Sequence, residues 1–415
     1  MISLLRKLLR TLAVLTIRKF QPGIIAVTGT VGKTSAKEAI YTVLRSVRSV
    51  RAASRSFNNE LGVPLTILGP WTEIKNPLIF WPKVIVSSLW QLWFGQNYPE
   101  LLVLEYAADR PGDIKYLLTI ARPQIAVMTA VGDIPVHIEF YAGPEHVARE
   151  KARLVEVLPI TGFAVLNSDD EMVWAMKERT RAHILTFGFN PTAEIKVVGF
   201  ENRSEELAMG GWKPAGILFK LEYGGSFVPV RLDGVFGKAQ AYAIAAAAAV
   251  GTIFGMNLVR IAEALQYYQA PPHRFKVLPG IKGTYILDDS YNASPLSMAG
   301  AFETVRELKA KRKVGVLGDM LELGEYAIPA HEDAGKLAAK TFDLLITAGT
   351  QGRLMAEAAQ KHGLHKKQIF SYDTAEEAGV ATQSLIEKGD LILVKASRGI
   401  GLEKVVEEIK LGYRV

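Results

Sequence analysis

The chain has 415 residues, of which 49% are hydrophobic and 22% charged, a globular composition that argues against intrinsic disorder. Cysteine is absent, which excludes disulfide bridges, thiolate nucleophiles and Cys-ligated zinc, so any bound metal must use oxygen or imidazole ligands. The formal net charge of +7 favours anionic partners such as nucleotides, acidic substrates or lipid headgroups.

The first 20 residues predict an amphipathic helix. On a helical wheel one side carries leucines and the other carries basic residues, namely Leu5, Leu8, Leu9, Leu12 and Leu15 against Arg6, Lys7 and Arg10. The uncharged run 11–17 is far shorter than the roughly 20 apolar residues that span a bilayer. No small-residue cleavage site follows. The pattern is typical both of a helix on a membrane surface and of one packed on the protein.

A second apolar segment, residues 77–95, contains three tryptophans and a single charged residue, Lys83. Two prolines and Lys83 interrupt it, so we predict no membrane-spanning helix here. A Trp-rich interfacial hairpin and ordinary core packing are the alternatives. Together with residues 1–22, this segment indicates peripheral contact with the inner face of a membrane.

From residue 23 onward, short β-branched runs alternate with helical stretches, which predicts an α/β fold with a mostly parallel sheet. The clearest strands lie in IIAVTG (24–29), LLVLEYA (101–107), IAVMTA (125–130) and FAVLNSD (163–169). Each ends in a polar or glycine-containing turn, where ligands of open α/β sheets bind. Residues 184–232 predict an antiparallel insertion or layer, and residues 239–254 an alanine-rich helix.

The dipeptide Pro271-Pro272 precedes a fresh set of strands and marks a domain boundary. We therefore divide the chain into an N-terminal helix (1–22), a central P-loop-type domain (23–272) and a smaller Rossmann-like C-terminal domain (273–415). Strands of the last domain are expected in TYILDDS (284–290), KVGVLGD (313–319), LLITAG (344–349) and DLILVKAS (390–397).

The sequence GTVGKT (29–34) lies in a predicted strand-to-helix turn and indicates a nucleotide site. Gly29 and Gly32 let the backbone amides around Thr30 converge on phosphate oxygens, and the helix N-terminus adds partial positive charge. Lys33 can bridge the β- and γ-phosphates of ATP, and the Thr34 hydroxyl can ligate Mg²⁺. General P-loop spacing would place a glycine two residues before this loop, where the chain has valine.

The compact TGTVGKT loop (28–34) resembles that of the Mur ligases, and five further segments resemble motifs of this family in the same order and spacing. They are FNNELGVPLTIL (57–68), LEYAADRPGDI (104–114), DDSYNASP (288–295), GDMLELG (318–324) and LVKASR (393–398). The resemblance covers roughly residues 23–410 and is greatest to the branch that adds D-alanyl-D-alanine to the peptidoglycan precursor. It implies a cytoplasmic, ATP-dependent amide ligase with a muramoyl-peptide acceptor.

Three positions after the phosphate loop carry the expected metal chemistry. Glu105 ends a predicted strand beside the loop, where a carboxylate needs a cation, and Mg²⁺ prefers oxygen ligands. The resemblance implies that Glu105, His137 and Lys151 hold a second Mg²⁺, with Lys151 carbamylated by CO₂ to an anionic ligand. An unmodified lysine would be repelled by the metal. Judged alone, a salt bridge, a structural histidine and a solvated lysine stay open as alternatives.

The resemblance also assigns residues around the nucleotide and the second substrate. Arg274 and Asn292 would approach the nucleotide when the C-terminal domain closes, and Asn58 and Asn59 would approach the sugar-linked substrate. The C-terminal side of the cleft would be lined by Asp319, Glu322, Lys395, Ser397 and Arg398, the last suited to a substrate carboxylate.

Asp288 and Asp289 stand together at a strand end, where a metal site, a general base and a turn are equally compatible with the pattern. The resemblance favours a role of Asp288 near ATP and the incoming amine. The residues expected to carry the chemistry are then Lys33, His137, Lys151 and Asp288.

The implied reaction is attack of a carboxylate on the γ-phosphate of ATP, followed by attack of an amine on the acyl phosphate. Standard Mur ligases carry a separate UDP-sugar-binding domain before the phosphate loop, and residues 1–22 are too few for it, so we expect that domain to be lacking. The alternatives are a ligase similar to folylpolyglutamate synthase and a non-catalytic P-loop scaffold at a membrane. We expect a monomer without a nucleic-acid partner.

Overall fold

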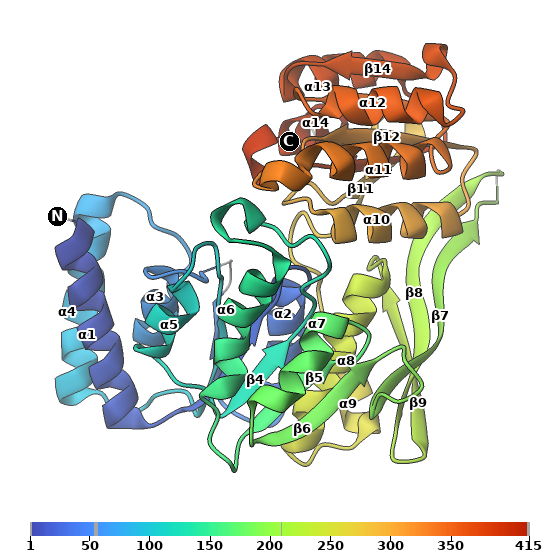
Figure 1. The fold of residues 1–415 in the computed structure, drawn as a ribbon. Helices are drawn as coiled ribbons and strands as arrows, with labels where there is room; N and C mark the ends of the chain where they lie inside the picture. Colours follow the sequence, from blue (N-terminus) through green and yellow to red (C-terminus); the bar gives the residue numbers. More distant parts are fainter. Residues whose placement is uncertain (1, 54–56, 209, 413–415) are drawn as a thin grey trace.

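The structure is a computed structural model that describes residues 2–53, 57–208 and 210–412. Its strands form two sheets, each dominated by parallel pairing (Figure 1). The nine-stranded sheet has the order β2-β3-β1-β4-β5-β6-β7-β8-β9, and the six-stranded sheet the order β10-β11-β15-β12-β13-β14. The predicted α/β fold class is therefore confirmed. The domain bounds at 22 and 272 stay a prediction.

The first sheet and its helices occupy the chain up to residue 265. Its strands are β1 (Gly23–Thr28), β2 (Val50–Ala52), β3 (Leu101–Glu105), β4 (Ile125–Met128), β5 (Phe163–Asn167), β6 (His183–Gly188), β7 (Ile195–Glu206), β8 (Trp212–Tyr223) and β9 (Ser226–Asp233). Its helices are α1 (Ile2–Phe20), α2 (Lys33–Leu44), α3 (Gly62–Leu68), α4 (Pro77–Phe94), α5 (Asp113–Leu118), α6 (Pro144–Glu156), α7 (Glu171–Trp174), α8 (Lys238–Ile253) and α9 (Leu258–Leu265).

The second sheet begins at Lys276. It contains β10 (Lys276–Pro279), β11 (Tyr285–Asp288), β12 (Arg312–Gly318), β13 (Leu344–Ala348), β14 (Ile369–Tyr372) and β15 (Asp390–Lys395). Its helices are α10 (Pro295–Glu307), α11 (Ala327–Ala339), α12 (Gly352–Lys361), α13 (Ala375–Leu385) and α14 (Glu403–Ile409). These strands and α8 confirm the elements expected from the sequence.

Strand β1 lies at the centre of the parallel part of the first sheet, between β3 and β4. Its alternate residues enter two separate cores. Ile25 and Val27 pack under α2, α8 and α9, whereas Ile24 and Ala26 pack under α3, α5 and α6. Burial on both faces explains why the strand is a continuous apolar run. The loops after β1, β3 and β4 consequently meet at one edge of the sheet.

The expectation of an antiparallel insertion over 184–232 was correct only for its later part. Strand β6 pairs parallel with β5 and belongs to the main sheet, because its second half is as buried as the strands beside it. Only β7, β8 and β9 pair antiparallel, and they extend the same sheet rather than form a separate layer. The β7–β8 ribbon reaches α10 (Figure 1), where Asn202 Nδ2 donates a 2.7 Å hydrogen bond to Glu307 Oε2.

The predicted N-terminal helix is present as α1 and packs against α3 and α4. Its leucine stripe divides between core and solvent. Leu9 and Leu12 are buried, while Leu8 and Leu15 are exposed. In the part of the chain that the structure describes, no helix has the length and apolarity needed to cross a bilayer.

Residues 77–95 do not form the hairpin that we offered as one alternative. They form a single helix, α4, that lies beside α1 at the edge of the molecule (Figure 1). Pro77 is compatible with helix because it occupies the first turn, where a backbone N–H has no intrahelical acceptor. Pro82 lies inside the helix and removes one hydrogen bond, and the packing of the inner side offsets this loss.

One lysine joins the two edge helices. Lys19 Nζ donates to the carbonyl oxygens of Gln91, Leu92 and Gly95 at 3.2, 2.9 and 2.8 Å. These carbonyls lie at the C-terminus of α4, where helix acceptors lack intrahelical donors and a cation is favourable. Lys19→Ala is therefore expected to lower the free energy of unfolding by about 1 kcal/mol. Urea titration measures it, with Arg18→Ala as the control; equal values for both variants would contradict it.

Candidate active site

The phosphate loop connects β1 to α2 with two glycines in left-handed or related conformations. Gly29 has φ 150° and Gly32 has φ 89°. A Cβ atom on Gly29 would lie 2.0 Å from Thr129 Oγ1, so only glycine fits there. Thr30 N donates to Ala130 O at 2.5 Å, which ties the loop to the segment after β4. The N-terminus of α2 thereby opens into the cavity, as an anion site requires.

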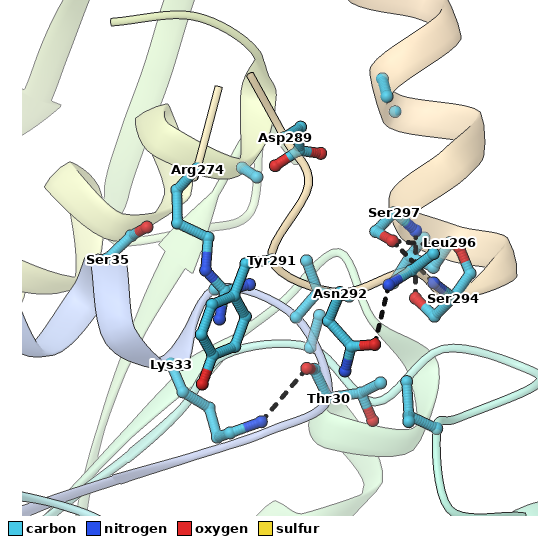
Figure 2. A pocket seen from close by; sticks show the side chains of 18 of the residues that line it. Thr30, Lys33, Ser35, Arg274, Asp289, Tyr291, Asn292, Ser294, Leu296 and Ser297 are labelled. Carbon is cyan, nitrogen blue, oxygen red and sulfur yellow. Dashed lines mark hydrogen bonds between the residues drawn. The ribbon is translucent and has the colours of Figure 1, made fainter. Parts of the chain in front are cut away.

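Lys33 is partly buried at the base of this loop. Its Nζ atom donates to Gly29 O at 2.9 Å and to Thr30 O at 3.2 Å, and Figure 2 shows the bond to Thr30. Burial lowers the pKa of Lys33, Glu105 raises it and Arg274 lowers it further. The amine is therefore poised beside the loop carbonyls in a site that favours an incoming anion, because a phosphate would compensate the cost of the buried charge.

Glu105 is held at the end of β3, in register with Val27 of β1. Its Oε1 atom accepts hydrogen bonds from Thr34 Oγ1 at 3.2 Å and from Asn58 Nδ2 at 3.0 Å. Its Oε2 atom is buried, with the residue only 2% exposed, and has no hydrogen-bond partner among the residues that the structure describes. A buried carboxylate oxygen without a partner is costly, and a divalent cation would satisfy it.

Lys151 comes from α6 and is buried. Its Nζ atom donates to Gly29 O at 3.0 Å, so it shares this carbonyl with Lys33. Burial and the nearby charge of Lys33 lower the pKa of Lys151 to about 7. A large fraction of this amine is therefore uncharged near neutral pH, which is the form that can react with an electrophile.

His137 follows β4 in a left-handed conformation, with φ 68°. Its Nε2 atom lies 3.2 Å from Asp109 Oδ1, and its Nδ1 atom lies 2.5 Å from Glu322 Oε2 without the geometry of a hydrogen bond. Burial lowers the pKa of His137 despite these two carboxylates. The contact with Glu322 joins the first sheet's loops to the segment after β12. Among the described residues, no three His, Asp or Glu side chains form a metal-binding group by themselves.

A cavity of about 890 Å³ lies over the loop and is lined by both parts of the molecule. Figure 2 shows Lys33, Arg274, Tyr291 and Asn292 pointing into it from both sides. It contains most of the expected site residues, namely Thr30, Gly32, Lys33, Asn58, Asn59, Glu105, His137, Arg274, Asn292, Glu322, Lys395, Ser397 and Arg398. Gly29, Thr34 and Lys151 lie behind this surface, bonded to residues named above.

Two expected residues of the C-terminal part do not line the cavity. The Asp288 carboxylate is engaged by His273 Nδ1 at 2.8 Å and by the Ser290 hydroxyl at 2.6 Å. Asp319 accepts from the Gly352 amide at 2.7 Å and so shapes the turn before α12. Both carboxylates order loops beside the cavity.

Asp289 faces the cavity instead, where it pairs with Lys395 at 2.5 Å. Burial raises the pKa of Asp289 and lowers that of Lys395. Lys395 Nζ also donates to Asn292 O at 3.0 Å, and the Ser397 hydroxyl accepts from Leu321 N at 2.9 Å. The bond from Lys395 fixes the loop that carries Asn292, and the bond to Ser397 fixes the segment after β12.

Several cavity residues were not expected from the sequence. Tyr291 lies between two guanidinium groups, with its ring centre 4.0 Å from Arg274 and 5.6 Å from Arg398. Asp109 contacts His137, and Asp169 and Asp170 line the far end. The position of the last two directly after the strand in FAVLNSD was a signal that could have found them, since ligands bind at the carboxyl ends of such strands.

Comparison with known proteins identifies relatives of this chain. The family model for the Mur ligase middle domain matches residues 91–251. The family model described as Mur ligase, glutamate ligase domain matches residues 273–398. The UDP-N-acetylmuramoyl-tripeptide--D-alanyl-D-alanine ligase of Mycobacterium tuberculosis is 31% identical over 409 residues, covering 93% of this chain and 72% of the relative.

The chain belongs to the Mur ligase family. The ligase of the same name from Bacillus subtilis is 28% identical, and the alignment covers 97% of this chain and 79% of that ligase. Among solved Mur ligases, the MurF ligase of Thermotoga maritima in complex with ADP has a TM-score of 0.76 at 27% identity, over 98% of this chain and 82% of that one.

A folylpolyglutamate synthase from Mycobacterium tuberculosis has a lower TM-score of 0.66 at 16% identity, covering 96% of this chain and 95% of that one. This likeness concerns the fold alone. The sequence prediction of a Mur ligase is therefore confirmed, and the synthase alternative has less support.

Proposed function

We propose that this Mur ligase joins the terminal carboxylate of a muramoyl peptide to the amine of D-alanyl-D-alanine at the expense of ATP. The observation that carries the proposal is the meeting of Lys33, Glu105 and Arg274 in one cavity, with Lys151 directly behind the phosphate loop. The relatives named as UDP-N-acetylmuramoyl-tripeptide--D-alanyl-D-alanine ligases support the choice of substrates.

In the first step, a carboxylate oxygen of the acceptor attacks the γ-phosphorus of ATP, and the bond to the β-γ bridging oxygen breaks to release ADP. Lys33 and the loop amides neutralise the charge of the transferred phosphoryl group. In the second step, the amine attacks the carbonyl carbon of the acyl phosphate, which expels inorganic phosphate and loses a proton. The cavity walls, to which both parts of the molecule contribute, exclude water from the acyl phosphate.

Two Mg²⁺ ions fit the chemistry of the donors here. Thr34 would hold one, and Glu105, His137 and a carbamylated Lys151 would hold the other, supported by the unpartnered Oε2 atom of Glu105. Bound Mg²⁺ supplies positive charge that offsets the phosphate oxygens. Asp288 keeps a proposed role near the amine by ordering, through Ser290, the loop that ends at Asn292.

Carbamylation of Lys151 requires its uncharged amine, whose nitrogen bonds to the carbon of CO₂ with loss of one proton. Because the pKa is lowered to about 7, this form increases as the pH rises through that value. We expect a carbamate carbon signal by NMR, with isotopically labelled bicarbonate, that grows from about pH 6 to about pH 8.

Lys151→Ala should lose this signal and ligase activity together, and short-chain carboxylic acids should restore part of the activity. The control is Arg149→Ala on the exposed side of the same helix, which should keep both. An unchanged carbamate signal in Lys151→Ala, or no rescue by any carboxylic acid, would count against the modification.

Substrate-dependent phosphate release tests the reaction. We expect release with UDP-N-acetylmuramoyl tripeptide plus D-alanyl-D-alanine, and none when either substrate is omitted. Release with folate and glutamate would instead favour the synthase-like alternative, and silence with both pairs would favour the scaffold. We further propose a monomer that acts in the cytoplasm, at the inner face of the membrane.

A further inference from the structure

Helix α4 has two apolar sides, of which the protein covers one. The inner side buries Phe80, Val84 and Ser88, which recur every four residues and face the core shared with α1 and α3. The opposite side carries an exposed apolar stripe, which we call the outer face of α4. It consists of Leu78, Ile79, Pro82, Val86, Leu89, Trp90, Trp93 and Phe94.

The outer face is unusually exposed for residues of this kind. Trp90 is 66% exposed and Trp93 78% exposed. Single exposed apolar side chains are ordinary on soluble proteins, but a contiguous row of this size marks an interaction surface. Trp90 and Phe94 pack on each other, with ring centres 4.5 Å apart, so the row is continuous toward the end of the helix.

The outer face is also held in place. Lys19 fastens the C-terminus of α4 through three carbonyl oxygens, and Phe20 stacks on Tyr98 with ring centres 4.7 Å apart. Helices α1 and α4 lie together at one edge of the molecule, away from the second sheet (Figure 1). A flat partner can therefore reach this edge while the cavity stays open.

The charged residues of α1 and α4 are all basic. Lys83 is an exposed residue of α4, α4 contains no acidic residue, and α1 presents exposed Lys7 and Arg18. Arg18 precedes the lysine that holds the last turn of α4, which places positive charge at the end where Trp93 and Phe94 lie. A second copy of the chain would bring these cations against each other, whereas anionic headgroups would complement them.

We propose that the outer face of α4 is a membrane-docking surface that lies in the interface of an anionic lipid bilayer. Tryptophan and phenylalanine favour the headgroup level of a membrane, and neighbouring basic residues add attraction to anionic lipids. The bilayer surface would then cover the side of α4 that the protein leaves exposed, although the helix is too interrupted to cross the bilayer. The inference is independent of the reaction proposed above.

Flotation with vesicles tests it on the full chain. We expect the protein to float with vesicles of mixed phosphatidylglycerol and phosphatidylcholine, and to float much less with phosphatidylcholine alone. The double variant Trp90→Gln, Trp93→Gln should lower the partition coefficient about tenfold or more. The matched control is Phe227→Gln, Tyr267→Gln, which removes two exposed aromatic side chains elsewhere and should bind like the wild type.

Two further measurements keep the test decisive. Brominated lipids should quench the tryptophan fluorescence of the unmodified protein, and Arg18→Glu with Lys83→Glu should reduce binding to the anionic vesicles. Thermal melting verifies that each variant is folded. A wild type that stays with the soluble fraction for both lipid mixtures would overturn the proposal. So would a dimer in solution that Trp90→Gln, Trp93→Gln converts to a monomer, since the face would then serve self-association.

Discussion

Lys33→Ala is expected to reduce substrate-dependent ATP turnover by about 10³-fold, because it removes the partly buried cation of the phosphate loop. Both hydrogen bonds of its amine are to loop carbonyls, so no other side chain loses a partner. The loop itself is kept by Gly29, Gly32 and the bond from Thr30 N to Ala130 O. The loss should therefore appear in kcat, with little change in folding.

The measurement is phosphate release with both substrates present, accompanied by thermal melting. Lys336→Ala is the control, since this lysine lies on the exposed side of α11 and pairs with Asp333 on the same helix. We expect its turnover to equal that of the wild type. Phosphate release that survives in Lys33→Ala at the control's rate would refute the assignment of the loop as the ATP site.

Glu105→Gln is expected to change activity and stability in opposite directions. The amide oxygen can still accept from Thr34 and Asn58, but the buried negative charge is lost. Activity should fall by about 10²-fold to 10³-fold because the Mg²⁺ ligand is weakened. The free energy of unfolding without Mg²⁺ should rise by about 1 kcal/mol, since a buried oxygen anion with no partner is removed.

Urea unfolding with and without Mg²⁺ separates the two effects. Mg²⁺ should stabilise the wild type, as any ligand of the folded state does, and should stabilise Glu105→Gln much less. Glu100→Gln is the control, because Glu100 precedes the same strand and its carboxylate accepts from Ser49 N. A variant that loses stability together with activity, or keeps its response to Mg²⁺, would show that Glu105 serves the fold instead.

Local sequence patterns predicted much of the fold. The phosphate loop, the strands around it and helix α8 depend on residues adjacent in the chain, so alternation, apolar runs and glycine placement were enough to predict them. The ordered motifs then indicated the family that the comparisons confirmed. The parallel pairing of β6 was missed, because a short half-buried strand has the same pattern in parallel and antiparallel pairing.

The choice between neighbouring residues needed the tertiary structure. Asp288 and Asp289 are equivalent in the sequence, but consecutive side chains at a strand end point to opposite sides. Asp289 therefore meets Lys395 in the cavity, and Asp288 turns to His273. Lys395 lies 106 positions along the chain from Asp289, so no local pattern could distinguish the two aspartates.

The sequence by itself determined the α/β class and predicted the nucleotide loop and the residues proposed to carry the chemistry, since each is encoded by a short stretch of chain. Only the tertiary structure decided that Lys151 shares the carbonyl of Gly29 with Lys33, although 122 positions separate it from that glycine. It also decided which side of α4 is covered, because an apolar helix does not specify which of its sides the core will take. Contacts between residues far apart in the chain depend on how the layers pack. That packing brings the predicted residues together around one cavity.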